Sequence, residues 1–340
     1  MKFSNNYIFY PDNAELTKAI VHFRSVYADQ GAIDISPNNT AAVQDNFIHT
    51  RGNFEPHRFN GGVLELACET FETKLAETSL EQNPHDWAVL QNSLGNTLAA
   101  LGQQRFDKEL YEKAMLAFSS VLDAFTQEDA PQDWATAQFN LGVVTQALGR
   151  LEGDAKAFKT SVDAFTDALL VWTREGEPER WAMTMFQLGT SFHEYGKLLK
   201  GNRTFQKSVV AFKNALVTLD ADNHPLALAA SHNSRGAVLH NLAESEENVE
   251  RMQEAIRAYE TALTVCMEQQ QPIHLAVLCR VNRSTAKTVM AELTKDPQIA
   301  EEAADDFELI MECFPHALQP LCLKHCQEQL KKAQSLQIAA

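Results

Sequence analysis

The residue types best suited to chemistry in this sequence gather near its C-terminal end. There Cys313 and His316 are followed by a second cluster made of Cys322, His325 and Cys326. On a helix, Cys322 lies one turn from both His325 and Cys326, so ligands of the kind that zinc prefers can converge. The alternative is that these side chains are ordinary core residues of terminal helices. We favour that alternative and predict no metal cofactor.

Catalytic motifs provide a second test for chemistry. His193 and Glu194 begin the helical zinc-protease pattern, but Lys197 stands where the second histidine is required. The sequence has no Gly-x-x-x-x-Gly-Lys-Ser/Thr phosphate loop, no Gly-x-Ser-x-Gly nucleophile elbow and no strand-linked Gly-x-Gly-x-x-Gly. We therefore expect that the chain is not an enzyme and needs no cofactor.

The charge balance limits the classes of partner. The 29 lysine and arginine residues stand against 45 aspartate and glutamate residues, a formal net charge of −16. Such a charge disfavours nucleic acid and anionic membranes, and no stretch approaches the roughly 20 apolar residues of a membrane span. The N-terminal residues lack the apolar region of a secretory signal, and six cysteines are too scattered for a disulfide framework. We expect a cytoplasmic protein that does not insert into membranes.

The elements that would position any site repeat with a fixed period. Prolines recur every 47 residues, at Pro37, Pro84, Pro131, Pro178, Pro225 and Pro272. Alanine follows each proline by four residues, at Ala41, Ala88, Ala135, Ala182, Ala229 and Ala276. A glycine column and an aromatic column keep the same spacing, at Gly95, Gly142, Gly189 and Gly236, and at Phe71, Phe118, Phe165, Phe212 and Tyr259. An internal period of this length is typical of a stacked repeat protein.

Each repeat has the pattern of two amphipathic helices. Apolar residues advance by three or four along residues 134–148 and again along residues 158–172. Between the two helices, Gly149 and Gly153 can end the first helix, and Asp154 can cap the next one. The small side chains of the glycine column allow neighbouring helices to approach closely, while Phe165 fills the gaps. Because a hairpin of two helices cannot bury apolar residues on both sides, the hairpins must stack.

Residues 131–142, which read Pro-Gln-Asp-Trp-Ala-Thr-Ala-Gln-Phe-Asn-Leu-Gly, resemble the first helix of the tetratricopeptide repeat in its long bacterial variety. The resemblance implies an all-α, right-handed solenoid of about six stacked helix hairpins. The repeats are expected at 37–83, 84–130, 131–177, 178–224, 225–271 and 272–315. Residues 1–36 are expected to form an N-terminal cap segment, and residues 316–340 a C-terminal capping helix.

The same resemblance implies a peptide-binding groove lined by the first helix of each repeat. Counted from the Leu-Gly pair, its columns contain Asn92, Asn96, Phe139, Val143, Gln146, Met183, Phe186, His193, Asn233, His240, Arg280 and Lys287. Amide side chains can hydrogen-bond a peptide backbone, and aromatic side chains can anchor it. The alternative is that Phe139 and Phe186 pack between neighbouring helices. Arg280 and Lys287, with Arg283, form a basic corner that would suit an acidic partner.

The sequence therefore predicts a noncatalytic scaffold or adaptor that binds a protein or peptide. An alternative is a regulator whose superhelix changes curvature when it binds a ligand or signalling peptide. Self-association through the ends of the array is a further possibility. The unusual turn at residues 51–62 either contacts a ligand or is plain surface.

Overall fold

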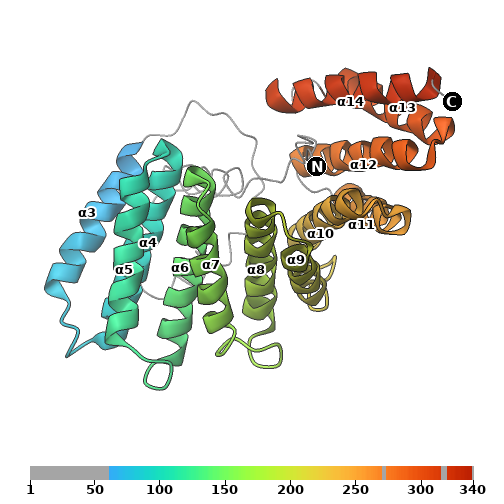
Figure 1. Ribbon diagram of the computed structural model, residues 1–340. Helices are drawn as coiled ribbons and strands as arrows, with labels where there is room; N and C mark the ends of the chain where they lie inside the picture. The colour runs from blue at the N-terminus through green and yellow to red at the C-terminus, as the bar shows by residue number, and fades with distance from the viewer. Residues whose placement is uncertain (1–60, 270–272, 315–319, 339–340) are drawn as a thin grey trace. The chain divides into compact units, whose positions relative to one another are not determined.

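The computed structural model describes residues 61–269, 273–314 and 320–338 (Figure 1). These residues form helices joined by short turns and contain no strand, which confirms the predicted all-α class for the described part. The chain divides between Gly201 and Asn202 into two compact units, called here the N-terminal and C-terminal units. The predicted cap at 1–36 and the turn as far as residue 60 lie outside the described residues. None of the described helices combines the length and the apolar character that a bilayer span needs.

The N-terminal unit is built from helices that pack against one another in chain order (Figure 1). They are α3 (Gly61–Glu77), α4 (Pro84–Arg105), α5 (Lys108–Ala124), α6 (Pro131–Glu152), α7 (Ala155–Ala168) and α8 (Pro178–Leu199). In addition, α4 contacts α6 and α6 contacts α8. The first helices of the repeats therefore form one layer, and α3, α5 and α7 form the other.

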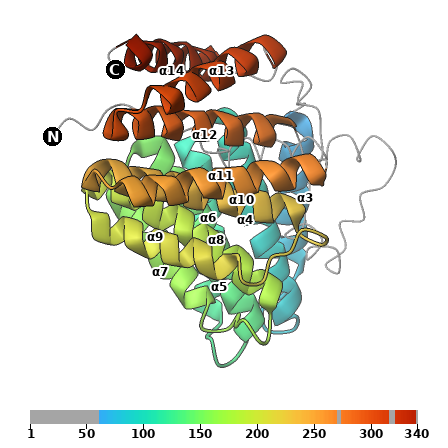
Figure 2. The ribbon, with the colours of Figure 1, turned by 90° about the vertical axis from the view of Figure 1, so that its right-hand side faces the viewer.

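Within the C-terminal unit, too, the helices pack against one another in chain order (Figure 2). Its helices are α9 (Asn202–Ala215), α10 (Pro225–Glu246), α11 (Val249–Glu268), α12 (Ile273–Thr294), α13 (Pro297–Cys313) and α14 (Pro320–Ile338). Here α10 also contacts α12, and α12 contacts α14. Residues 320–338 are therefore helical, as predicted for the end of the chain. Whether α14 acts as a cap stays a prediction.

The recurring prolines start the long helices. Pro84, Pro131, Pro178 and Pro225 each stand in the first turn of a helix of 22 residues. A proline costs nothing there, because its missing N–H would have had no partner inside the helix. The predicted position of the prolines is confirmed for these four helices.

The turn inside each hairpin also repeats. The residue that follows the first helix takes a left-handed conformation in every case, at Phe106, Gly153, Lys200, Glu247 and Lys295, with φ between 49° and 65°. In four of the five turns the next residue caps the second helix with its side chain, at Asp107, Asp154, Asn248 and Asp296. The predicted helix stop at Gly153 and cap at Asp154 are confirmed. The fold therefore accepts a left-handed residue in each turn even where it is not glycine.

The glycine and aromatic columns pack against each other within a hairpin. A methyl group at Gly142 would lie 2.7 Å from the ring of Phe165, and one at Gly236 would lie 2.8 Å from the ring of Tyr259. Phe165 and Tyr259 are fully buried. This confirms the expectation that glycine lets the two helices approach around an aromatic side chain.

The last hairpin is one residue out of step with the period. The left-handed residues follow one another by 47 positions up to Glu247, but Lys295 comes 48 positions later. Helix α12 begins at Ile273, whereas the spacing from Pro225 predicts position 272. The columns assigned to Arg280 and Lys287 therefore belong to Val281 and Thr288, and this corrects the alignment of the sixth repeat.

Candidate binding surface

Six of the twelve predicted groove residues are buried, and the first is Asn92. The Asn92 amide donates to the Ala88 carbonyl at 3.1 Å, and its oxygen accepts a hydrogen bond from Asn140 Nδ2 at 3.0 Å. Asn92 stands on α4 and Asn140 on α6, so the pair joins two neighbouring first helices. A buried amide is stable only when its polar atoms have partners. Asn92 thus links repeats and exposes almost no surface to a ligand.

Gln146 plays a similar part between α6 and α8. Its Nε2 donates to the Gln187 carbonyl at 3.1 Å and to Ser191 Oγ at 2.8 Å. Ser191 in turn lies 2.7 Å from Ser161 Oγ, which donates to the Gly142 carbonyl at 2.8 Å. The network connects α6, α7 and α8 through buried side chains only. Gln146 is therefore an internal link of the repeat stack.

Phe139 follows the alternative interpretation, in which it packs between helices. Its ring makes an edge contact with Phe165 at 5.5 Å and a tilted contact with Trp172 at 5.6 Å, measured between ring centroids. Only 8% of Phe139 is exposed. Its aromatic surface is used inside the hairpin.

The two predicted histidines are also internal. His193 is 2% exposed, and burial, reinforced by the nearby Lys197 charge, lowers the pKa of its imidazole well below the ordinary value. It is therefore neutral at pH 7. His240 is fully buried, and within the described part of the chain neither of its ring nitrogens has a hydrogen-bond partner. Its Nε2 lies 3.8 Å from Glu244 Oε1, beyond hydrogen-bond range.

The environment of His240 has a clear structural parallel in the N-terminal unit. His240 occupies the place in α10 that Gln146 occupies in α6, fifteen residues after the proline. Ala286 on α12 occupies the place that Ser191 occupies on α8, thirteen residues after the start of the helix. Ala255 on α11 occupies the place that Ser161 occupies on α7. Both alanines belong to the apolar cluster of the C-terminal unit. The hydroxyl groups of the hydrogen-bond network around Gln146 are thus absent at the equivalent positions around His240.

Asn233 repeats the link made by Asn92. It is fully buried, and its oxygen accepts a hydrogen bond from Asn282 Nδ2 at 3.0 Å. Asn282 lies 49 residues beyond Asn233, whereas Asn140 lies 48 residues beyond Asn92, so the extra residue before α12 keeps the pair in register. An Asn–Asn pair therefore joins first helices in both units.

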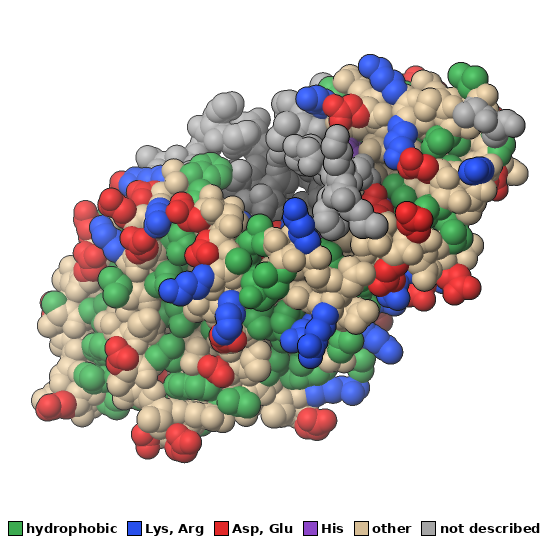
Figure 3. All heavy atoms as spheres, viewed as in Figure 1, with side chains coloured by type: hydrophobic (Ala, Val, Ile, Leu, Met, Phe, Trp, Pro, Cys, Tyr) green, Lys and Arg blue, Asp and Glu red, His purple; other side chains and the backbone are tan. Residues whose placement is uncertain are grey.

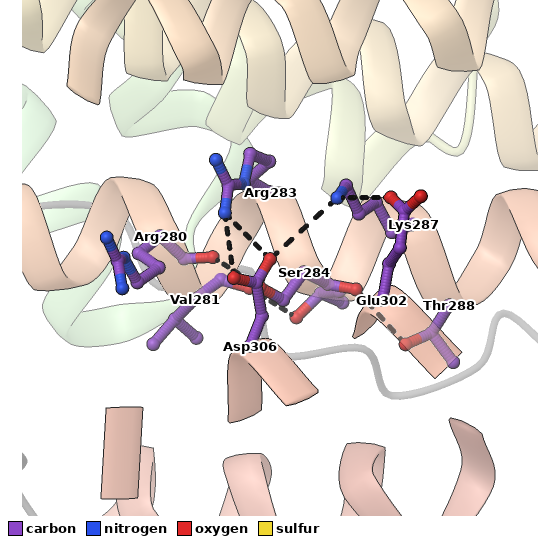
Figure 4. A network of polar contacts seen from close by, with 9 residues as sticks. Arg280, Val281, Arg283, Ser284, Lys287, Thr288, Glu302 and Asp306 are labelled. Atoms are coloured by element: carbon purple, nitrogen blue, oxygen red, sulfur yellow. Dashed lines mark hydrogen bonds and ion pairs between the residues drawn. The ribbon is translucent and has the colours of Figure 1, made fainter. Parts of the chain in front are cut away.

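The basic corner on α12 is neutralised by α13 (Figure 4). Arg283 Nη2 lies 2.7 Å from Asp306 Oδ2, and Lys287 Nζ lies 2.8 Å from Glu302 Oε2. The Arg280 guanidinium points away from Asp306 in the same view. Two of the three cations are thus paired within the chain, and all three are partly exposed.

The Cys and His cluster near the C-terminus falls into separate environments. His325 Nε2 lies 2.9 Å from Thr285 Oγ1, Cys326 is buried in an apolar cluster, and Cys313 is exposed. His316 and the side chain of Cys322 lie outside the described residues. In the ranges that the structure describes, no three His, Cys, Asp or Glu side chains come together as a metal ion requires.

The first helices of the N-terminal unit share a stripe of accessible side chains. On each helix it consists of the residues that lie 5, 12, 16 and 19 positions after the proline. We call it the inner stripe. It consists of Val89, Asn96, Ala100 and Gln103 on α4, Thr136, Val143, Ala147 and Arg150 on α6, and Met183, Thr190, Glu194 and Lys197 on α8, all at least partly exposed. The buried Asn92–Asn140 and Gln146–Ser191 pairs flank it on either side.

The inner stripe does not continue unchanged into the C-terminal unit. On α10 the same offsets hold Ala230 and Ala237, which are buried, and Asn241 and Glu244, which are partly exposed. On α12, Thr285 is buried and in contact with His325 of α14. A binding surface on the first helices is therefore best formed in the N-terminal unit.

No protein-family model and no curated protein matches this sequence. Among solved structures, the crystal structure of BtubC (BKLC) from P. vanneervenii is similar in 81% of this chain and 91% of that chain. The two chains share 16% sequence identity, and the superposition has a TM-score of 0.47.

Sequence reasoning found three members of the inner stripe, Asn96, Val143 and Met183, and missed most of the others. Phe186, outside the stripe, is also partly exposed. The spacing of the missed residues could have identified them, because residues 5, 12, 16 and 19 positions after the proline lie on one narrow side of a helix with 3.6 residues per turn. Small and neutral side chains fill most of these offsets, so neither charge nor aromatic character drew attention to them.

Proposed function

We propose that this chain is a tetratricopeptide-like solenoid that binds a protein or peptide without catalysis. The observation that carries the proposal is the inner stripe of the N-terminal unit. Its residues recur every 47 positions on three neighbouring first helices and are at least partly exposed. The columns at offsets 9 and 13 are buried on all three helices, and those at offsets 8 and 15 are buried except for Phe186 and Ala99. The proline-started helices and, within each unit, the packing of each helix on the next support the solenoid architecture.

The chemistry of the stripe suits an extended peptide backbone. Asn96, Thr136 and Thr190 offer donors and acceptors that do not depend on the sequence of a peptide. Val143 and Met183 lie between them and provide apolar contact. Three helices packed about 10 Å apart span about 20 Å, which corresponds to about six extended residues. The predicted ligand is therefore a short segment of another protein.

The ionisable residues of the stripe support a binding role rather than a catalytic one. Glu194 and Lys197 pair with each other at 2.6 Å on the surface of α8, and Arg150 provides a cation on α6. An acid–base reaction needs a titratable group held beside a nucleophile or a reacting atom, and Thr190 and Thr136 are not accompanied by a histidine in the stripe.

Affinity capture tests the proposal. The variant Val143→Arg, Thr190→Arg places two bulky cations on the inner stripe, whereas the control Leu116→Arg changes a side chain that is 68% exposed on α5. We expect the stripe variant to lose the partners that the wild type and the control retain from a native lysate. Identical partners and yields for all three proteins would place the function elsewhere.

A further inference from the structure

The outer face of α9 is basic and apolar in a protein that is strongly acidic. The helix contains Arg203, Lys207 and Lys213 but no aspartate or glutamate, while the whole chain has a formal net charge of −16. The three cations are exposed, and so are Val210 and Val217, at 57% and 51%. Positions 203, 207 and 210 share one side of α9, and Val217 lies in the turn that follows the helix. We call this set of five residues the basic face.

The outer face of α13 has the opposite character. Glu301, Asp305, Glu308 and Glu312 follow one another at helical spacing, and all four are exposed. Leu309 stands beside them and is 43% exposed. Glu308 Oε1 accepts a hydrogen bond from Gln334 Nε2 of α14 at 3.3 Å. We call these five residues the acidic face.

The two faces are complementary in length as well as in charge. Along their helices the basic face extends from Arg203 to Lys213, about 15 Å, and the acidic face extends from Glu301 to Glu312, about 17 Å. Both carry exposed aliphatic side chains among the charges, and Figure 3 shows apolar side chains exposed between charged ones on the side of the molecule that it displays. A contact between such faces would combine ion pairs with burial of apolar surface.

We propose that the basic face of α9 binds the acidic face of α13 in a second copy of this chain. A second copy is the partner for which the chain itself supplies both halves of the contact. Like net charge opposes the approach of two copies, so the association depends on the local match of the faces. Repeated head to tail from copy to copy, the contact is heterologous and leads to a closed ring or an open chain of molecules, whereas two reciprocal contacts about a two-fold axis give a dimer.

The size of the contact determines its expected strength. A stable interface buries about 800 Å² on each partner, and one pair of short helices provides less. We therefore expect weak, reversible self-association that is strongest at low salt, because exposed charges are screened as ionic strength rises. This proposal concerns the C-terminal unit and does not depend on the peptide-binding role of the inner stripe.

Charge reversal separates this proposal from general surface effects. One variant carries Arg203→Glu, Lys207→Glu and Lys213→Glu, and the other carries Glu301→Lys, Asp305→Lys and Glu312→Lys. A control carries Lys74→Glu, Lys113→Glu and Lys156→Glu on exposed lysines of α3, α5 and α7, and it makes the same change in net charge as the basic-face variant. Circular dichroism verifies that each full-length variant remains helical.

Sedimentation equilibrium of the full chain provides the measurement. At about 0.05 M salt we expect the wild type and the control to exceed the monomer mass of 38.0 kDa as concentration rises, and to return towards it at about 0.5 M salt. Each reversed variant alone should associate at least about tenfold more weakly. An equimolar mixture of the two should associate again, because each basic face then meets an acidic one. A wild type that stays monomeric, or reversed variants that associate as well as the wild type, would overturn the proposal, as would a mixture that fails to associate.

Discussion

The ring of Phe165 occupies the space that a side chain at Gly142 would need. A methyl group on Gly142 would lie 2.7 Å from the Phe165 ring, well inside van der Waals contact. The same relationship joins Gly236 to Tyr259 in the C-terminal unit. The shared period of the glycine and aromatic residues thus reflects one packing contact, which is made by Gly95 with Phe118, by Gly142 with Phe165 and by Gly236 with Tyr259.

Substitution of Gly142 tests this contact. We expect Gly142→Ala to lower the free energy of unfolding by about 1 to 3 kcal/mol, because overpacking forces the ring and the helices apart. Phe165→Ala should cost about 3 to 5 kcal/mol through the cavity that it leaves. The control Gly201→Ala meets nothing closer than 4.0 Å and should be close to neutral. Urea unfolding followed by circular dichroism measures all three, and equal midpoints for Gly142→Ala and Gly201→Ala would contradict the packing.

At the left-handed turn residues, substitution by glycine is expected to raise the free energy of unfolding, in contrast to the substitutions at Gly142 and Phe165. Lys200 and Glu247 have φ of 53° and 49°, a conformation that costs a residue with a side chain about 1 kcal/mol relative to glycine. Lys200→Gly and Glu247→Gly should therefore each raise the free energy of unfolding by about 0.5 to 1 kcal/mol. Gly153→Ala should lower it by a similar amount, since Gly153 has φ of 65°. Thermal unfolding measures the shifts, and a lower melting temperature for both glycine variants would count against the turn geometry.

The architecture was predictable because its signals are local and repeated. Pro131 starts a helix, Gly153 ends it and Asp154 caps the next one, and each of these roles follows from backbone chemistry within a few residues. The all-α class and the hairpin turns of the described residues followed from them. The sixth hairpin was misaligned by one residue. There Ser284 replaces the glycine of the column, and the buried aromatic residue Phe307 comes 48 rather than 47 positions after Tyr259.

The binding columns were harder to predict, because burial depends on contacts between repeats. Asn92 and Gln146 are polar, and polar residues are usually exposed, so the pattern favoured a groove. In the folded chain their hydrogen-bond partners, Asn140 and Ser191, come from the next first helix, 45 to 48 residues away. Only the spatial arrangement of neighbouring helices shows that these amides face each other rather than a ligand.

The buried network around Gln146 predicts what happens when one hydroxyl is lost. Ser191→Ala removes an acceptor at 2.8 Å from Gln146 Nε2 and the neighbour of Ser161 Oγ. We expect a cost of about 1 to 3 kcal/mol, the usual penalty for weakening a buried hydrogen-bond network. Denaturant midpoints measure it, and Ser120→Ala on the exposed side of α5 serves as the control. A loss no larger than that of the control would show that the network contributes nothing.

At the equivalent position in the C-terminal unit, adding a hydroxyl group is expected to raise the free energy of unfolding. Ala286 stands where Ser191 stands, opposite the place of His240, whose ring nitrogens have no hydrogen-bond partner among the described residues. Ala286→Ser should therefore supply a donor or acceptor and raise the free energy of unfolding by about 1 kcal/mol. In a His240→Leu background the same substitution should instead be destabilising, because the hydroxyl would then be buried without that partner. A double-mutant cycle of unfolding free energies measures the coupling, and a coupling of zero would contradict the equivalence of the two sites.

The histidine on α14 predicts how stability changes with pH. Burial, the largest effect, together with the neighbouring His240, outweighs the attraction of Glu328 and lowers the pKa of His325 to about 4. In the unfolded chain an imidazole binds its proton near pH 6.5, so between pH 6.5 and pH 4 the unfolded state holds the additional proton. The free energy of unfolding must then fall as the pH falls through that window, by about 2 to 3 kcal/mol at pH 4.5.

His325→Gln does not titrate, so the loss of stability between pH 7 and pH 4.5 should be smaller by that amount than in the wild type. Urea unfolding at both pH values measures the difference. A variant His325→Gln with the full acid sensitivity of the wild type would show that the imidazole of His325 is not held neutral by the fold.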